Sequence, residues 1–83
     1  SLSSSSAASD VYKRQDYDIA VDSNVSITVY DISGQVVEVL VDDYKFAGEY
    51  SITWNAQNYS SGVYFIGMES NGEYFTQKLM LVK

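Results

Sequence analysis

The 83-residue sequence contains no cysteine, no histidine and no proline. The absence of cysteine excludes disulfides and thiolate catalysis, and the absence of histidine removes the commonest general base and zinc ligand. Without proline, no strand at a sheet edge is protected by that residue. No paired-acid or serine–base arrangement indicates an enzyme, and we expect no cofactor and no metal site. No apolar run has the length of a membrane span.

Basic residues are also scarce, with five Lys and Arg against eleven Asp and Glu and a net charge of −6. An acidic surface repels phosphate backbones, so the charge argues against nucleic acid as a partner. Aromatic residues are abundant at 14%, among them eight tyrosines, and such residues favour strands over helices. The length allows one small domain.

Alternation of apolar and polar residues is the main structural signal. It predicts six short strands bounded by turn residues: 17–21, 25–30, 35–41, 50–54, 63–69 and 73–82. Residues 42–48 and 55–61 are expected to be loops, and Gly34 is expected to close a tight turn. Short strands with frequent turn signals are typical of an antiparallel β-sandwich, so the fold class is all-β.

The predicted core follows from the same alternation. Its inward side chains are Val25, Ile27, Val29, Ile52 and Trp54, together with alternate residues of 79–82. In residues 63–68 both parities are apolar, so the pattern leaves open which face is buried.

The last two dozen residues form the most informative segment. Ser61-Gly62 precedes an apolar stretch, and Asn71-Gly72 favours a two-residue type I′ turn between residues 63–69 and 73–82. This hairpin, with Gly62, Val63, Tyr64 and Phe65 at its start and lysines near its end, resembles the C-terminal sorting domains of the type IX secretion system. The stretch Tyr30-Asp31-Ile32-Ser33-Gly34, the pair Ala47-Gly48 and Trp54 also match that family. Ala20 departs from it, because a proline is common at that position.

The resemblance implies a fold, a function and partners. The fold would be a small immunoglobulin-like sandwich over residues 16–83, with an incomplete first strand. The domain would direct a cargo protein, encoded upstream and missing from this chain, through the periplasm to the outer membrane or the extracellular surface of a Bacteroidota bacterium. Its partners would be an outer-membrane translocon and a sortase-like peptidase, with no bound membrane segment. The residues expected to be recognised are Gly62, Val63, Tyr64, Phe65, Lys78 and Lys83.

Two other interpretations remain open for these residues. Gly62, Val63, Tyr64 and Phe65 can simply begin a strand, and Lys78 and Lys83 can protect an edge strand against aggregation. The alternative function is a structural immunoglobulin-like spacer or binding module of a surface or flagellar assembly protein.

Residues 1–15 differ from the rest of the chain. They are rich in serine and alanine and end with Lys13-Arg14, an order that does not fit a signal peptide. Residues 5–15, SSAASDVYKRQ, resemble the translation of a transposon-end adapter used in shotgun sequencing, which would mark a metagenomic fragment. We therefore predict that residues 1–15 are disordered and that the authentic chain begins near Asp16.

Overall fold

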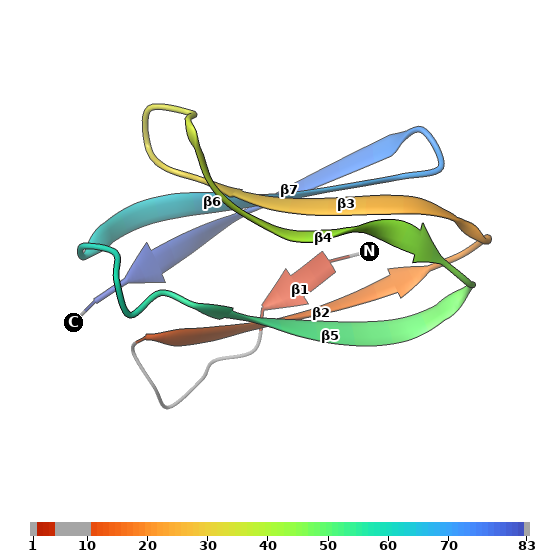
Figure 1. The fold of residues 1–83 in the computed structure, drawn as a ribbon, viewed down its shortest axis with the longest axis horizontal. Helices are drawn as coiled ribbons and strands as arrows, with labels where there is room; N and C mark the ends of the chain where they lie inside the picture. Colours follow the sequence, from red (N-terminus) through yellow and green to blue (C-terminus); the bar gives the residue numbers. More distant parts are fainter. Residues whose placement is uncertain (1, 5–10, 83) are drawn as a thin grey trace.

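The computed structural model describes residues 2–4 and 11–82, which form two antiparallel sheets packed face to face (Figure 1). The strands are β1 (Leu2–Ser4), β2 (Tyr12–Ile19), β3 (Ser23–Tyr30), β4 (Val36–Lys45), β5 (Gly48–Asn55), β6 (Gly62–Ser70) and β7 (Glu73–Leu81). The prediction of an all-β antiparallel sandwich is confirmed, with the short β1 added to the six predicted strands.

The larger sheet has the strand order β4-β3-β6-β7. Strands β6 and β7 pair without interruption from Ser70 opposite Glu73 to Gly62 opposite Leu81. The turn between them has φ of 50° at Asn71 and 78° at Gly72. Both values are typical of a type I′ turn, which matches the twist of the two strands and confirms the predicted hairpin.

The smaller sheet has the order β1-β2-β5, and β2 pairs with β5 along the whole length of both strands. Strand β1 pairs with β2 from Leu2 opposite Tyr17 to Ser4 opposite Gln15. It also lies against β7 of the larger sheet without pairing with it. This contact brings the two sheets together along one side of the sandwich.

The core lies between the sheets and contains the side chains that the alternation predicts. Val25, Ile27, Val29 and Trp54 are fully buried, and Ile52 packs against them. The structure adds buried side chains that the strand pattern did not single out: Tyr17, Ile19, Val41 and Ala56.

The connection between β4 and β5 is much shorter than predicted. Residues 42–45 were expected to be loop, but β4 continues to Lys45 and only Phe46 and Ala47 separate it from Gly48. Polar and charged residues can extend an edge strand because their side chains face solvent while the backbone pairs. Asp42 and Tyr44 pair in this way with Ser26 and Asn24 of β3.

The start of β2 also differs from the predicted boundary at Asp16. Tyr12–Gln15 lie within β2, and Leu2–Ser4 form β1, whereas disorder was expected there; residues 1 and 5–10 lie outside the described residues. The reason is that backbone pairing with β5 places few demands on the side chains of residues 12–15, provided that none of them is proline. The adapter origin of residues 5–15 is a separate question and stays a prediction.

Candidate recognition surface

The residues at the start of β6 that were predicted to be recognised do not all lie on the same face of the strand. Tyr64, Ile66 and Met68 are buried between the sheets, so Val63 and Phe65 lie on the opposite, outer face and are half-buried. Of the residues predicted to be recognised, therefore, Tyr64 belongs to the core. Val63 and Phe65 face outward, where a partner can reach them.

Tyr64 is held by specific contacts within the core. Its ring packs edge-on against Trp54, with centroids 5.2 Å apart, and its hydroxyl donates a hydrogen bond of 2.7 Å to the Ser60 carbonyl oxygen. Tyr59 packs on the same Trp54 at 5.5 Å. These contacts fix the chain just before β6, and they give Tyr64 a structural role.

A row of side chains crosses the outer face of the larger sheet at one end, three of them apolar or aromatic and the last a lysine. The register places Val36 opposite Tyr30, Tyr30 opposite Phe65, and Phe65 opposite Lys78, one residue from each of the four strands. Beside this row, Val63 lies opposite Met80. Val36 and Met80 are 60% and 53% exposed, which is unusual for apolar side chains grouped on one surface. We call Val36, Tyr30, Val63, Phe65, Lys78 and Met80 the outer-face patch.

The outer edge of β7 borders this patch. A two-residue hairpin closes on a pair that exchanges both backbone hydrogen bonds, here Ser70 and Glu73. Since the direction of the backbone groups alternates, Tyr74, Thr76, Lys78 and Met80 direct their N–H and C=O groups away from β6. Within residues 2–4 and 11–82, no strand pairs with that side of β7.

Two other edges of the sandwich, those of β4 and β5, are less suited to pairing with a further strand. Strand β4 has two register shifts against β3, at Ile27/Thr28 and at Val29/Tyr30, which disturb its ladder. Strand β5 has a regular register, but its outward side chains are polar: Glu49, Ser51, Thr53 and Asn55. Strand β7 thus combines a regular edge with apolar neighbours on the outer face.

The turn between β3 and β4 lies at the same end of the sandwich as the end of β7 (Figure 1). One carboxylate oxygen of Asp31 accepts hydrogen bonds from the Ser33 hydroxyl at 2.6 Å, the Ser33 amide at 2.9 Å and the Gln35 amide at 3.0 Å. These bonds, that from the Ser33 hydroxyl above all, lower the pKa of Asp31. The turn leaves Ile32 75% exposed, a further apolar side chain near the outer-face patch.

Tyr74 covers the middle of the hairpin. Its hydroxyl lies over Gly67, where a side chain would overlap it, and it reaches Tyr30 across β6 in a hydrogen bond between the two hydroxyls. Desolvation of the phenol, followed by the neighbouring Tyr30, raises the pKa of Tyr74. This link ties β7 to β3 and keeps the outer edge in register.

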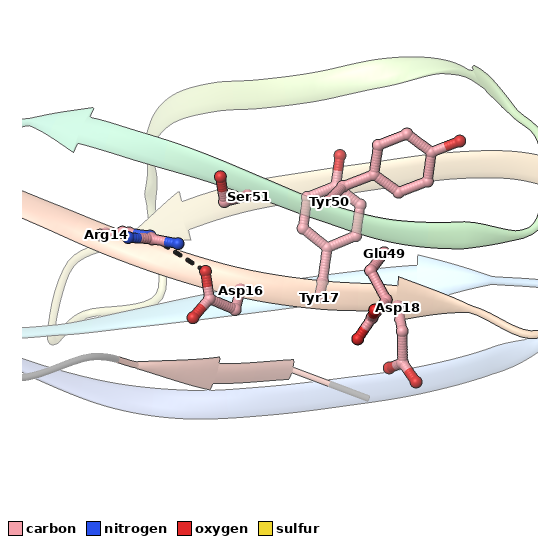
Figure 2. A pocket seen from close by; sticks show the side chains of 7 residues that line it. All are labelled: Arg14, Asp16, Tyr17, Asp18, Glu49, Tyr50 and Ser51. Atoms are coloured by element: carbon pink, nitrogen blue, oxygen red, sulfur yellow. Dashed lines mark hydrogen bonds and ion pairs between the residues drawn. The ribbon is translucent and has the colours of Figure 1, made fainter.

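A hollow of about 470 Å³ lies on the smaller sheet, lined from β2 and β5 (Figure 2). The rings of Tyr17 and Tyr50 stack 5.4 Å apart, and burial raises the pKa of Tyr17. Asp16 and Asp18 point to the other side of β2 from the Tyr17 ring, and Asp16 pairs with Arg14 at 3.1 Å (Figure 2). Across residues 2–4 and 11–82, no three acidic side chains converge as a metal site would require.

The comparison with protein families identifies the kind of domain that carries these surfaces. The family model described as the secretion system C-terminal sorting domain matches residues 13–83. The chain belongs to this family. The sorting domain is a type IX secretion signal that marks a cargo protein for secretion, and it is non-catalytic. A search of curated proteins found no match, and neither did a search of solved structures.

Family membership extends over nearly all of the described sandwich. The match includes β2 to β7 from residue 13 onward, while β1 precedes it. Within the described residues, the sorting domain contains no helix that is long and apolar enough to cross a membrane. The domain interacts with the secretion machinery, and its cargo is a secreted or cell-surface protein.

The predicted recognition residues of the sorting domain occupy different positions in the structure. Val63, Phe65 and Lys78 share the outer-face patch, Tyr64 is buried, and Gly62 begins β6 with φ of 153°. Lys83 lies outside the described residues. The sequence pattern did not single out Met80 or Val36 and did not predict Tyr30 as a recognition residue, since their neighbourhood depends on the register of four strands.

Proposed function

We propose that an outer-membrane translocon recognises the sorting domain at β7 and at the start of β6, through Gly62, Val63, Phe65, Lys78 and Lys83. The cargo would cross the periplasm to the outer membrane or the extracellular surface. A sortase-like peptidase would be the second partner, acting on the segment before the domain. The single observation that supports this proposal best is the regular edge of β7 beside the outer-face patch, with which no strand among residues 2–4 and 11–82 pairs.

Strand addition is the recognition mode that this edge favours. A partner strand can pair with the outward backbone groups of Tyr74, Thr76, Lys78 and Met80, so that the backbone supplies affinity and the side chains supply selectivity. Strand β1 does not occupy this position, because it pairs with β2 in the other sheet. Tyr64 supports the arrangement from inside the core and is not itself a contact.

Two proline substitutions at adjacent positions separate recognition from folding. Thr76 directs its amide outward, so Thr76→Pro removes no hydrogen bond to β6 and should cost the fold only about 1 kcal/mol. It nevertheless removes one donor from the edge and places a ring where a partner strand would lie. The neighbouring Gln77→Pro deletes a donor of the β6–β7 ladder and should destabilise the domain by about 3 kcal/mol.

The assay is secretion of a reporter protein fused to residues 13–83 in a bacterium that carries the type IX machinery. We expect Thr76→Pro to abolish secretion although the purified domain keeps its fold, as measured by circular dichroism. Gln77→Pro should lose both its fold and the secretion of the fusion. If the fusion is still secreted with Thr76→Pro, or after deletion of residues 70–83, the edge is not recognised and the proposal is wrong. A spacer domain would likewise tolerate Thr76→Pro, so the same variant tests the alternative function.

A further inference from the structure

We infer that the outer-face patch selects a particular partner segment: a translocon strand with a carboxylate side chain directly opposite Lys78 and an apolar side chain two residues away, opposite Met80. This inference rests on the proposed function, since it presupposes that a strand is added to β7. It goes beyond that function by naming the side-chain chemistry that the partner must present.

The first argument is the charge at Lys78. The chain carries a net charge of −6, so acidic side chains outnumber basic ones on its surface. Arg14 pairs with Asp16 at 3.1 Å, and the Lys45 amino group lies 5.3 Å from the centre of the Tyr50 ring. In the part of the chain that the structure describes, no carboxylate pairs with Lys78. A carboxylate on a partner would supply the missing counter-charge.

The second argument is what surrounds Lys78 on the outer face. Phe65 lies directly opposite on β6, and Thr76 and Met80 are its neighbours along β7. None of them is acidic, and Phe65 and Met80 are apolar, so the field of the ammonium group is not cancelled locally. A carboxylate brought into this apolar setting is less screened by solvent than it would be on an open polar surface.

The third argument is the geometry of strand addition. A residue paired with Lys78 across the edge would have its Cβ about 4.5–5.5 Å from that of Lys78, on the same outer face. Its neighbour two residues along the partner strand would lie opposite Met80 and extend the apolar surface formed by Val63 and Met80. Opposite charges favour this register, and a lysine or arginine facing Lys78 would be rejected.

The experiment combines cross-linking with a charge exchange in the secretion assay. A photo-reactive phenylalanine analogue placed at Met80 of the fusion should cross-link to the translocon, and mass spectrometry should locate the cross-link in an extended segment with an acidic residue. Lys78→Glu should reduce secretion of the fusion at least about tenfold, because it places two negative charges face to face. Secretion of the Lys78→Arg fusion should stay within about twofold of that of the unaltered fusion. Lys45→Glu changes the net charge equally on β4 and serves as the matched control.

Replacing the acidic residue in the cross-linked segment by lysine should restore secretion of Lys78→Glu and impair secretion of the unaltered domain. If Lys78→Glu is secreted normally while Thr76→Pro is not, the inference is wrong and the proposed function stands. If both are secreted, the proposed function itself fails. A cross-link between two copies of the domain, with dimers in sedimentation that Thr76→Pro abolishes, would show that β7 pairs with itself and would overturn the inference.

Discussion

Tyr64 and Phe65 are adjacent in sequence but should respond to substitution in opposite ways. Tyr64 is 7% exposed and packs edge-on against Trp54, and its hydroxyl bonds to Ser60. Tyr64→Phe removes only that hydrogen bond and should cost about 1 kcal/mol. Tyr64→Ala also opens a cavity beside Trp54 and should cost about 3–5 kcal/mol. At about 0.05–0.15 kcal/mol per residue, a domain of this size has roughly 4–12 kcal/mol in total, so Tyr64→Ala should remove between about a quarter and all of its stability.

Phe65 lies on the outer face, where it contributes little to the core. Phe65→Thr replaces an aromatic side chain by a β-branched one, and both kinds favour strands, so it should change the free energy of unfolding by no more than about 1 kcal/mol. If Phe65 contacts the translocon, however, the same substitution should reduce secretion of a reporter fusion several-fold.

The assay pairs thermal unfolding of the purified domain with secretion of the fusion. We expect a decrease in Tm of about 4–8 °C for Tyr64→Phe with normal secretion, and a similar or smaller decrease for Phe65→Thr with impaired secretion. The opposite result, with Tyr64→Phe blocking secretion at unchanged Tm and Phe65→Thr having no effect, would refute the assignment of the two faces.

Three further predictions concern the turns and the tyrosines. Hydrogen bonds lower the pKa of Asp31, so its contribution to stability is present above its ordinary value of 3.8 and is lost as the pH falls below it; the Tm difference between the unaltered domain and Asp31→Asn should therefore shrink below pH 4. Burial raises the pKa values of Tyr17, Tyr59 and Tyr74 above 10.0, so the stability that they contribute is present below that pH, and the Tm should fall as the pH rises beyond it. Gly67→Ala should cost about 1–2 kcal/mol through overlap with the Tyr74 hydroxyl, and much less when Tyr74→Ser is also present; equal costs in denaturant unfolding would contradict this coupling.

Much of the fold could be predicted from the sequence because one face of most strands is buried. The alternation at Val25, Ile27 and Val29 places those side chains in the core, and Asn71-Gly72 determines the hairpin. Where the signal was local, as in the Asp31 turn, the prediction also agreed with the structure.

The remaining features depend on pairing between distant segments. In residues 63–68 both sets of alternate side chains are apolar, so either set could have faced the core. Only the register with β3 and β7 places Tyr64 inside and Phe65 outside. The extension of β4 through Asp42 was missed because charged residues suggest a loop, whereas an edge strand tolerates them. The outer-face patch combines residues from four strands, so nothing in the local sequence around Met80 or Val36 indicated that they belong to one surface.

We propose that the outer edge of β7, with which no strand of the described part of the chain pairs, becomes paired on the translocon. Amide hydrogen exchange, measured residue by residue by NMR, tests it directly. In the free domain, the amides of Phe75, Gln77 and Leu79 should exchange slowly, and those of Tyr74, Thr76, Lys78 and Met80 should exchange fast. Addition of the detergent-solubilised translocon should slow the second group and leave the first group slow. If the complex forms while the amides of Thr76 and Lys78 continue to exchange fast, strand addition at β7 is contradicted.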